Sequence, residues 1–362
     1  MRFIHTADWH IGLRARKLGT KGERIREERF AAGKRVIDLA RAEKVDFILL
    51  AGDLFDDNAI DRNQIQKTAD ILRSAPCPVY VIPGNHDPFA PGSAWSHPSF
   101  KNAGNVHLLT ENVPVPVPGG VLYPCPLREK KSSSDPTAWI SAVSGKTVSI
   151  GIAHGSVEGC PIEEWDHPIP RDAASSRGLD YLALGHWHSM GLFKDECGAV
   201  RMAYPGTPET TKFGEENAGN ALLVEIPGPG IAPQARSFET GSFAWMTVEK
   251  QLLEPGDVAD LEKLVEGIPD SQNTLLRIEL SGHISAEEGV RMSNLSGILE
   301  SRFLWGSIDD QVLTPLPSDN GWAETLPSAF LRDVAKMVTE ASVADAVKTR
   351  ALFELYAMIE EE

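Results

Sequence analysis

The stretch Phe47-Ile48-Leu49-Leu50-Ala51-Gly52-Asp53 decides the fold. Five apolar residues lead into a glycine and then a carboxylate, which is the pattern of a buried strand that leaves its sheet at Gly52. In open α/β sheets, ligands and reacting groups collect at the carboxyl ends of the strands. We therefore expect Asp53 to lie at such an end, within a functional site.

Further stretches repeat this pattern of an apolar strand followed by polar side chains. They end at residues 7, 83, 153 and 184, and each is followed, directly or after one glycine, by aspartate, asparagine or histidine. Carboxylate and amide oxygens mixed with imidazole nitrogens suit manganese, iron or zinc better than calcium. Because these strand ends are expected at one rim, the sequence predicts a metal site built from Asp8, His10, Asp53, Asn85, His154, His186 and His188.

Length and composition bound the class of protein. The chain has 362 residues, of which 42% are hydrophobic and 24% charged, which is enough for two soluble domains with their own cores. We see no signal peptide and no apolar run near the roughly 20 residues that a membrane span needs. The four cysteines form no Cys-x-x-Cys pair, so we expect reduced, packing cysteines in a cytoplasmic protein without a membrane anchor.

Charge is distributed unevenly along the chain. The net charge of -16 disfavours a nucleic-acid partner, because phosphates are normally bound by lysine and arginine. Residues 14–35 nevertheless hold nine basic residues against three acidic ones, a local charge of +6 beside the expected metal site. A basic lip suits an anionic substrate, although a solvated helix face gives the same pattern. The candidate DNA contacts are Arg14, Arg16, Lys17 and Lys21.

The order of expected elements divides the chain. Strands at 2–7, 46–51 and 78–83 alternate with helices at 24–43 and 63–74, which predicts a largely parallel sheet flanked by helices. From residue 105 a second sheet with antiparallel edges is expected. We place the first domain at 1–226, a Pro-Gly-Pro-Gly linker at 227–242, a small α+β domain at 243–315 and a helical segment at 316–362. The amphipathic helices of that last segment pack on their own domain or dock on a partner.

The polar motifs, taken as an ordered set, resemble a known family. Asp8-x-His10, Gly52-Asp53, Gly84-Asn85-His86-Asp87, His154-Gly155 and Gly185-His186-x-His188 are similar to the signature of the calcineurin-like metallophosphoesterases. This resemblance implies an α/β fold, a four-layer α-β-β-α sandwich. Within the superfamily, residues 5–10 and 51–56 resemble the SbcD/Mre-type DNA repair exonucleases. That likeness implies a small capping domain and a helical attachment for an SbcC-like, SMC-type ATPase.

The resemblance also implies roles for individual residues. Asp8, His10 and His188 would hold one of two divalent ions, preferably manganese, and Asn85, His154 and His186 the other. Asp53 would bridge the two ions. The expected catalytic residues are His86, which would face the scissile phosphate, and Asp87, which would orient the His86 ring. A turn residue and a cap are the plain alternative for this pair.

The leading function is a manganese-dependent DNA exo/endonuclease, the nuclease subunit of a complex with the ATPase, and the family resemblance suggests a homodimer. One alternative is a metallophosphoesterase acting on small phosphodiesters such as cyclic nucleotides or nucleotide-sugar diesters. Another is an architectural subunit, which the intact ligand set argues against. One position departs from part of the family: archaeal and eukaryotic Mre-type members have histidine where this chain has Asp56, whereas bacterial SbcD-like members resemble this chain.

Overall fold

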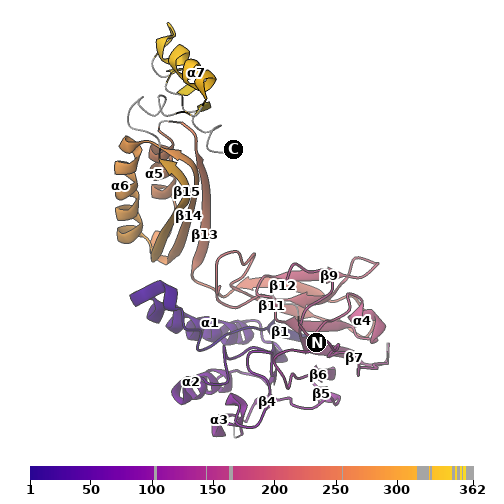
Figure 1. The fold of residues 1–362 in the computed structure, drawn as a ribbon. Helices are drawn as coiled ribbons and strands as arrows, with labels where there is room; N and C mark the ends of the chain where they lie inside the picture. The colour runs from indigo at the N-terminus through magenta and orange to yellow at the C-terminus, as the bar shows by residue number, and fades with distance from the viewer. Residues whose placement is uncertain are drawn as a thin grey trace. The chain divides into compact units, whose positions relative to one another are not determined.

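The computed structural model divides the chain into two compact units, Met1–Phe243 and Ala244–Glu362. Each unit is described by itself (Figure 1). The structure describes residues 1–101, 104–143, 145–162, 166–254, 256–315, 326, 328–344, 347–348, 351–352 and 354–355. Much of the second helix expected near the carboxyl terminus therefore lies outside the described residues. No described helix combines the length and the apolar character that crossing a membrane requires.

The first sheet of unit 1 has the strand order β12-β11-β1-β2-β3-β4. β1, β2 and β3 are mutually parallel, as expected, and β11 pairs antiparallel with both β1 and β12. β4 also pairs parallel, with β3, so its residues belong to the first sheet and not to the second sheet expected from residue 105 on. Every residue of β2 is buried, because a parallel sheet is covered on both faces and its strands read as continuous apolar runs. The bounds are β1 Arg2–Thr6, β2 Phe47–Ala51, β3 Val79–Ile82, β4 Val106–Leu108, β11 Asn220–Glu225 and β12 Gln234–Glu239.

The second sheet of unit 1 has the order β5-β6-β7-β8-β10-β9. Its inner strands β6, β7, β8 and β10 are parallel, and its edge strands β5 and β9 are antiparallel. The antiparallel edges expected from the sequence are thus present. The bounds are β5 Val115–Val117, β6 Gly120–Cys125, β7 Val148–His154, β8 Tyr181–Gly185, β9 Gly191–Lys194 and β10 Val200–Tyr204.

Three cores hold these layers together, which confirms the predicted α-β-β-α arrangement. Ile48 and Leu50 pack toward the helices, whereas Phe47 and Leu49 pack between the two sheets, because successive strand residues face opposite ways. A third core fills the outer face of the second sheet, where the short helix α4 lies (Figure 1). The helical elements are η1 Arg16–Lys21, α1 Gly22–Ala42, α2 Arg62–Arg73, η2 Ala94–Ser96, α3 Pro98–Lys101 and α4 Ala173–Ser176.

The Pro-Gly-Pro-Gly stretch has a different role from the expected linker. β12 lies inside the range 227–242 and pairs with β11 from Glu225↔Gln234 to Asn220↔Glu239. The prolines and glycines therefore form the turn of a hairpin that completes the first sheet. The side chains of β12 are largely exposed, which is usual for an edge strand. The sequence of this strand is therefore hard to tell from that of a linker. The change from one unit to the next comes after Phe243, within one residue of the expected start of the small domain.

Unit 2 contains a three-stranded sheet of order β13-β14-β15. Both pairings are parallel, so the expected α+β domain is in detail a β-α-β-α-β unit. α5 contributes Leu261 and Val265 to its core, and α6 contributes Leu295 and Leu299. The bounds are β13 Ala244–Leu252, α5 Asp257–Glu266, η3 Ser271–Asn273, β14 Thr274–Ile284, α6 Ala286–Arg302, β15 Trp305–Pro315 and α7 Ala329–Glu340.

Candidate metal centre

The candidate ligands come together where parallel strands of the two sheets end. β1, β2 and β3 of the first sheet lead into the loops carrying Asp8, His10, Asp53 and Asn85, while β7 and β8 of the second sheet end at His154 and just before His186. One hydrogen bond joins the sheets directly at this point: the His154 ring Nδ1 lies 2.8 Å from the Ala51 carbonyl oxygen. The sequence predicted the strand ends, and the structure adds that two sheets face each other there.

Asp8, His10 and His188 form the first cluster. Ligand atoms from these side chains lie within 4.8 Å of one another. The Nε2 atom of His10 is buried and, within the described part of the chain, has no hydrogen-bond partner. A buried polar atom without a partner is costly, and a cation beside it would remove that cost. The cluster therefore fits a divalent ion.

Asn85, His154 and His186 form the second cluster. The Asn85 side-chain oxygen lies 2.7 Å from His154 Nε2 and 3.1 Å from His186 Nδ1. Asp53 lies between the clusters, with Oδ2 at 3.3 Å from His154 Nε2 and 3.7 Å from His10 Nε2. The mixed oxygen and imidazole donors suit a transition-metal ion. The structure thus brings all seven sequence-predicted ligands into two adjoining clusters.

The backbone at several of these residues adopts a conformation that L-residues rarely take. The φ angles are positive at Asp8 (55°), His10 (44°), Asp53 (51°) and His186 (112°). Such conformations cost about 1–3 kcal/mol each and collect at functional sites. The loops also pack backbone to backbone: a Cβ atom on Gly185 would lie 1.9 Å from the Ala51 carbonyl oxygen. The surrounding fold therefore holds these loops in an uncommon backbone conformation.

Hydrogen bonds tie the ligand loops to one another. The His10 backbone N–H donates to the Asp53 carbonyl over 3.1 Å, and the His86 N–H donates to the Asp53 carboxylate over 2.9 Å. Across the two sheets, the His186 N–H donates to Asp8 Oδ1 over 3.0 Å. These hydrogen bonds therefore fix the ligand loops against each other.

The loop after β3 differs from prediction in the role of Asp87. Its carboxylate accepts hydrogen bonds from the Gly84 N–H at 2.7 Å and the Phe55 N–H at 3.0 Å, so it ties two loops together. The His86 ring is oriented by another group, because its Nδ1 lies 2.9 Å from the Asp56 carbonyl oxygen. Burial, with Asp53 nearby, raises the pKa of Asp87 to about 7. His86 itself lies at the cavity, edge-on to His10 with 4.7 Å between ring centroids.

Buried charges of opposite sign set the protonation of the centre. Burial alone would lower the pKa of His154, but Asp53 and Asp8 outweigh it and raise that pKa to about 9. Burial would likewise raise the pKa of Asp53, yet His154 holds it below its ordinary range. Burial lowers the pKa of His10 to about 4 and raises that of Asp8 to about 6. At neutral pH the His154 ring is therefore in its cationic form, with a proton on each nitrogen. A bound metal ion would displace one of these two protons.

A cavity of 350 Å³ opens over the two clusters. Besides His10, Asp53, His86, His186 and His188, its lining includes side chains that the sequence did not single out. Among these are Leu13, Lys212, Phe213 and Glu215. The loop carrying the last three follows β10 and the turn at Pro205-Gly206. Of the two tryptophans within the ligand motifs, Trp187 also lines the cavity, whereas Trp9 is a core residue.

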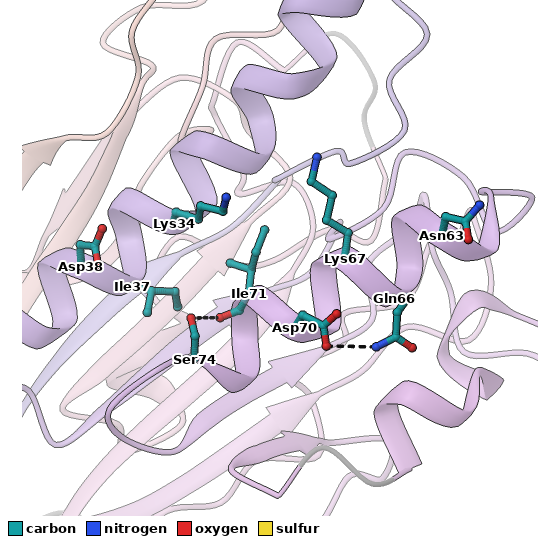
Figure 2. Close-up of a pocket in the computed structure, with 9 residues that line it drawn as sticks. All are labelled: Lys34, Ile37, Asp38, Asn63, Gln66, Lys67, Asp70, Ile71 and Ser74. Atoms are coloured by element: carbon teal, nitrogen blue, oxygen red, sulfur yellow. Dashed lines mark hydrogen bonds between the residues drawn. The ribbon is translucent and has the colours of Figure 1, made fainter.

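A larger hollow of 580 Å³ lies between α1 and α2, away from this chemistry (Figure 2). Lys34 and Lys67 line it, and none of the candidate ligands is among its described lining residues. The Lys67 ammonium is already engaged, because it lies 2.6 Å from a Glu27 carboxylate oxygen. Size alone does not mark the functional site of this chain.

The predicted DNA contacts begin close to the cavity. The Leu13 N–H donates to the His10 carbonyl over 3.1 Å, and the side chains of Arg14 and Lys21 are exposed beyond it. The side chains of Arg16 and Lys17 lie outside the described part of the structure. The position of this basic stretch is therefore known, whereas its contacts stay a prediction.

The family of the chain follows from a comparison with family models. The model for the calcineurin-like phosphoesterases matches residues 1–190, the part that contains all seven candidate ligands. The chain belongs to this family. Calcineurin-like phosphoesterases are hydrolases that depend on a dinuclear metal centre, and the two clusters are candidates for that centre.

Relatives of this calcineurin-like phosphoesterase carry two kinds of name. An uncharacterized metallophosphoesterase, YhaO, of Bacillus subtilis is 28% identical over 92% of this chain and 89% of its own length. The DNA double-strand break repair protein Mre11 of Saccharolobus solfataricus is 27% identical over 58% of this chain and 55% of its own length. One of the subunits of the SbcCD nuclease from B. subtilis is 26% identical over 64% of this chain and 67% of its own length.

Proposed function

We propose that this phosphoesterase hydrolyses phosphodiester bonds of DNA, as the nuclease subunit of an SbcD/Mre-type complex. The observation that carries the proposal is the convergence of seven ligand-type side chains in two adjoining clusters, beside a cavity that four of them line together with His86. The names of two relatives, a break repair protein and a nuclease subunit, supply the substrate class. Both alignments cover only part of those relatives, so substrate and partner are proposals here.

The proposed reaction assigns each cluster a task. Asp8, His10 and His188 would hold one divalent ion and Asn85, His154 and His186 the other, with Asp53 lying between the clusters; manganese is the expected metal. Ions held there would supply Lewis acidity toward the phosphoryl oxygens and would make water more acidic. Water would add to phosphorus and release a proton to the solvent, the P–O bond to the leaving strand would break, and the leaving oxygen would take a proton. His86 stands at the cavity to donate that proton or to stabilise negative charge.

The DNA backbone would approach along the basic stretch. Arg14 and Lys21 offer exposed positive charge along the stretch that follows the cavity residue Leu13, and Lys212 and Phe213 form part of the cavity wall. A cationic side chain attracts phosphate, and an aromatic ring can stack on an unpaired base. This local arrangement counters the net charge of -16, which would otherwise repel DNA.

The second unit supports a partner-dependent nuclease. In α7, Phe330 and Met337 are two helical turns apart, and each exposes 72% of its surface. Exposed apolar residues at this spacing are the anchors that an amphipathic helix presents to a partner. We propose that an SMC-type ATPase covers this face and that residues 243–315 cap the nuclease domain. The assembly could also contain two copies of this chain.

The proposal is tested by digestion of linear duplex and single-stranded DNA with the purified chain and Mn²⁺. Asp53→Asn removes the shared carboxylate charge and should abolish cleavage. Asp57→Asn is the matched control. Asp57 lies in the same loop as Asp53, and its exposed carboxylate pairs with Lys130. Manganese-dependent cleavage that survives only in the control supports the proposal. Cleavage that persists in Asp53→Asn would refute it.

A hydrolase of small phosphodiesters is the second candidate. The overall acidity and the modest cavity of 350 Å³ favour it. Bis-p-nitrophenyl phosphate and cyclic nucleotides test it in the same buffer, with the same variants. Deleting residues 316–362 separates the two functions, because a small-molecule hydrolase should keep its rate. A nuclease subunit should lose complex formation with its ATPase.

A further inference from the structure

The two clusters differ in the groups that contact their histidines from behind, at the ring nitrogen that faces away from the cluster. His188 presents Nδ1 to Glu215 Oε1 at 2.7 Å, and His10 presents Nδ1 to Asp56 Oδ1 at 3.3 Å. His154 of the second cluster instead presents Nδ1 to a backbone carbonyl, that of Ala51, at 2.8 Å. Two histidines of the first cluster are thus backed by carboxylates, whereas His154 is backed by a neutral group.

Glu215 is held firmly in this position. Its side chain is only 2% exposed, and its Oε2 accepts the Thr211 backbone N–H over 2.7 Å. The Thr211 hydroxyl donates to the other carboxylate oxygen and lies 3.0 Å from His188 Nδ1. The loop after β10 therefore delivers a buried negative charge to the back of a candidate ligand. Neither Thr211 nor Glu215 was predicted from the sequence.

Asp56 is anchored through its main chain. Its N–H donates to the Ile11 carbonyl over 3.0 Å, and its own carbonyl oxygen lies 2.9 Å from His86 Nδ1. The side chain, 24% exposed, is left to face His10. An Asp56→Asn substitution would keep the backbone contacts and the shape of the side chain. It would remove only the charge beside His10.

The remaining ligands increase the contrast between the clusters. The first cluster contains the Asp8 carboxylate, whereas its counterpart in the second is the neutral amide of Asn85. Asp53 is common to both, with its Oδ2 between His10 and His154. In a buried site, each additional carboxylate within a few ångströms attracts a divalent cation strongly, because little water screens it. The first cluster is therefore the more negative by Asp8, Asp56 and Glu215.

We propose that Asp56 and Glu215 are positioning residues that strengthen cation binding by the Asp8–His10–His188 cluster. That cluster consequently fills before the Asn85–His154–His186 cluster. A carboxylate on Nδ1 holds the hydrogen there, leaves the Nε2 lone pair for the ion and makes the ring a stronger donor. Loss of such a partner typically weakens metal binding by about 10–100-fold. This inference rests on the metal centre of the proposed function, and it does not depend on DNA being the substrate.

The test is a calorimetric titration of the metal-free full chain with Mn²⁺, with the free ion followed in parallel by electron paramagnetic resonance. The wild type should bind in two steps of unequal affinity. Asn85→Ala should remove the weaker step and keep the tighter one, which assigns the steps to the clusters. Asp56→Asn and Glu215→Gln should each weaken the tighter step by about 10–100-fold.

Matched controls separate positioning from general damage. Asp57→Asn and Glu216→Gln remove neighbouring exposed carboxylates and should leave both steps unchanged. The melting temperature of each metal-free variant shows whether the fold has suffered, because a purely structural role would lower it without changing the tighter step selectively. Glu215→Asp keeps the charge and should recover part of the lost affinity.

Equal affinities in the wild type, or an unchanged tighter step in both Asp56→Asn and Glu215→Gln, would overturn the inference. A chain that binds no Mn²⁺ would overturn it as well. DNA digestion is scored separately on the same preparations. Two-step binding without any DNA cleavage would leave the inference standing and count against the proposed nuclease.

Discussion

Gly33→Ala tests whether helix α1 fixes the loop that carries Asp8 and His10. Gly33 is buried on α1, and a Cβ atom there would lie 2.4 Å from Cζ3 of Trp9. The Trp9 ring has no room to retreat, because it is only 1% exposed and its Nε1 donates to the Thr6 hydroxyl over 2.9 Å. The Trp9 carbonyl is held too, by the Arg29 guanidinium at 2.9 Å.

The magnitude follows from these contacts. A normal carbon–carbon contact needs about 3.5 Å, so Trp9 or α1 must move by about 1 Å. Overpacking of this kind costs about 1–3 kcal/mol, and alanine in place of glycine returns about 1 kcal/mol of helix stability. We expect a net loss of roughly 0–2 kcal/mol in the free energy of unfolding. A shift of about 1 Å in the flanking ligands should lower activity by about 100-fold.

Urea unfolding measures the first effect, and Mn²⁺ affinity with hydrolysis of bis-p-nitrophenyl phosphate measures the second. Gly297→Ala is the matched control: it lies in α6, where a Cβ atom would meet nothing within 4 Å. The control should gain about 1 kcal/mol of stability and keep its metal affinity. Wild-type metal affinity in Gly33→Ala would refute the view that α1 positions the first loop.

Three further predictions concern buried charge. Burial raises the pKa of Glu209 from 4.5 to about 7. The contribution of Glu209 to the free energy of unfolding is therefore complete below pH 4.5, and about 3 kcal/mol should be lost as the pH rises through 7. Urea unfolding against pH measures this loss, and Glu209→Gln should flatten the curve between those values. Asp53 and Asp8 outweigh burial and raise the pKa of His154 to about 9, so Mn²⁺ affinity should increase with pH up to about 9, by roughly tenfold per unit. Calorimetry in buffers of different ionisation enthalpy should detect the released proton, and a pH-independent affinity would contradict this account. Arg29→Met removes the cation that binds the Trp9 carbonyl and lies near the Glu215 and Glu209 carboxylates. The free energy of unfolding, measured by thermal denaturation, should fall by about 3–5 kcal/mol. A fall below about 1 kcal/mol would be inconsistent with that role.

The strand ends could be predicted because of how a parallel sheet is covered. β2 is buried along its whole length, so its sequence is a run of apolar residues, and the glycine after it marks where the chain turns away. The same reasoning located Asp8, Asn85, His154 and His186 near the other ends. The family match and the four-layer fold confirm that part of the prediction.

Contacts between distant loops could not be predicted in this way. His5 lies in the same motif as His10 and has the same chemistry, yet its ring is buried between the Tyr181 hydroxyl and the Leu184 carbonyl, 3.0 Å from each. Asp87 turns from its expected partner to two backbone N–H groups. Glu215 reaches His188 across a loop of ordinary composition. Side-chain direction depends on neighbours that only the assembled sheets supply.

The polar edge strand was the main error in the expected domain limits. A hairpin turn and an interdomain linker both favour proline and glycine, and they differ only in whether the next segment finds a strand to pair with. β12 pairs along its full length with β11, although its own side chains are mostly exposed. Pairing of this kind is made by backbone groups, on which the side-chain pattern carries little information.

The hydrogen bonds between ligand loops have a consequence for protein engineering. Because Asp53 receives the His86 N–H and Asp8 receives the His186 N–H, each loop is the template on which another one is shaped. A loop borrowed alone from a relative would arrive without the partner that holds its backbone. Recombination within this family should therefore succeed when these loops are exchanged together, as one inherited block, and fail when they are exchanged singly.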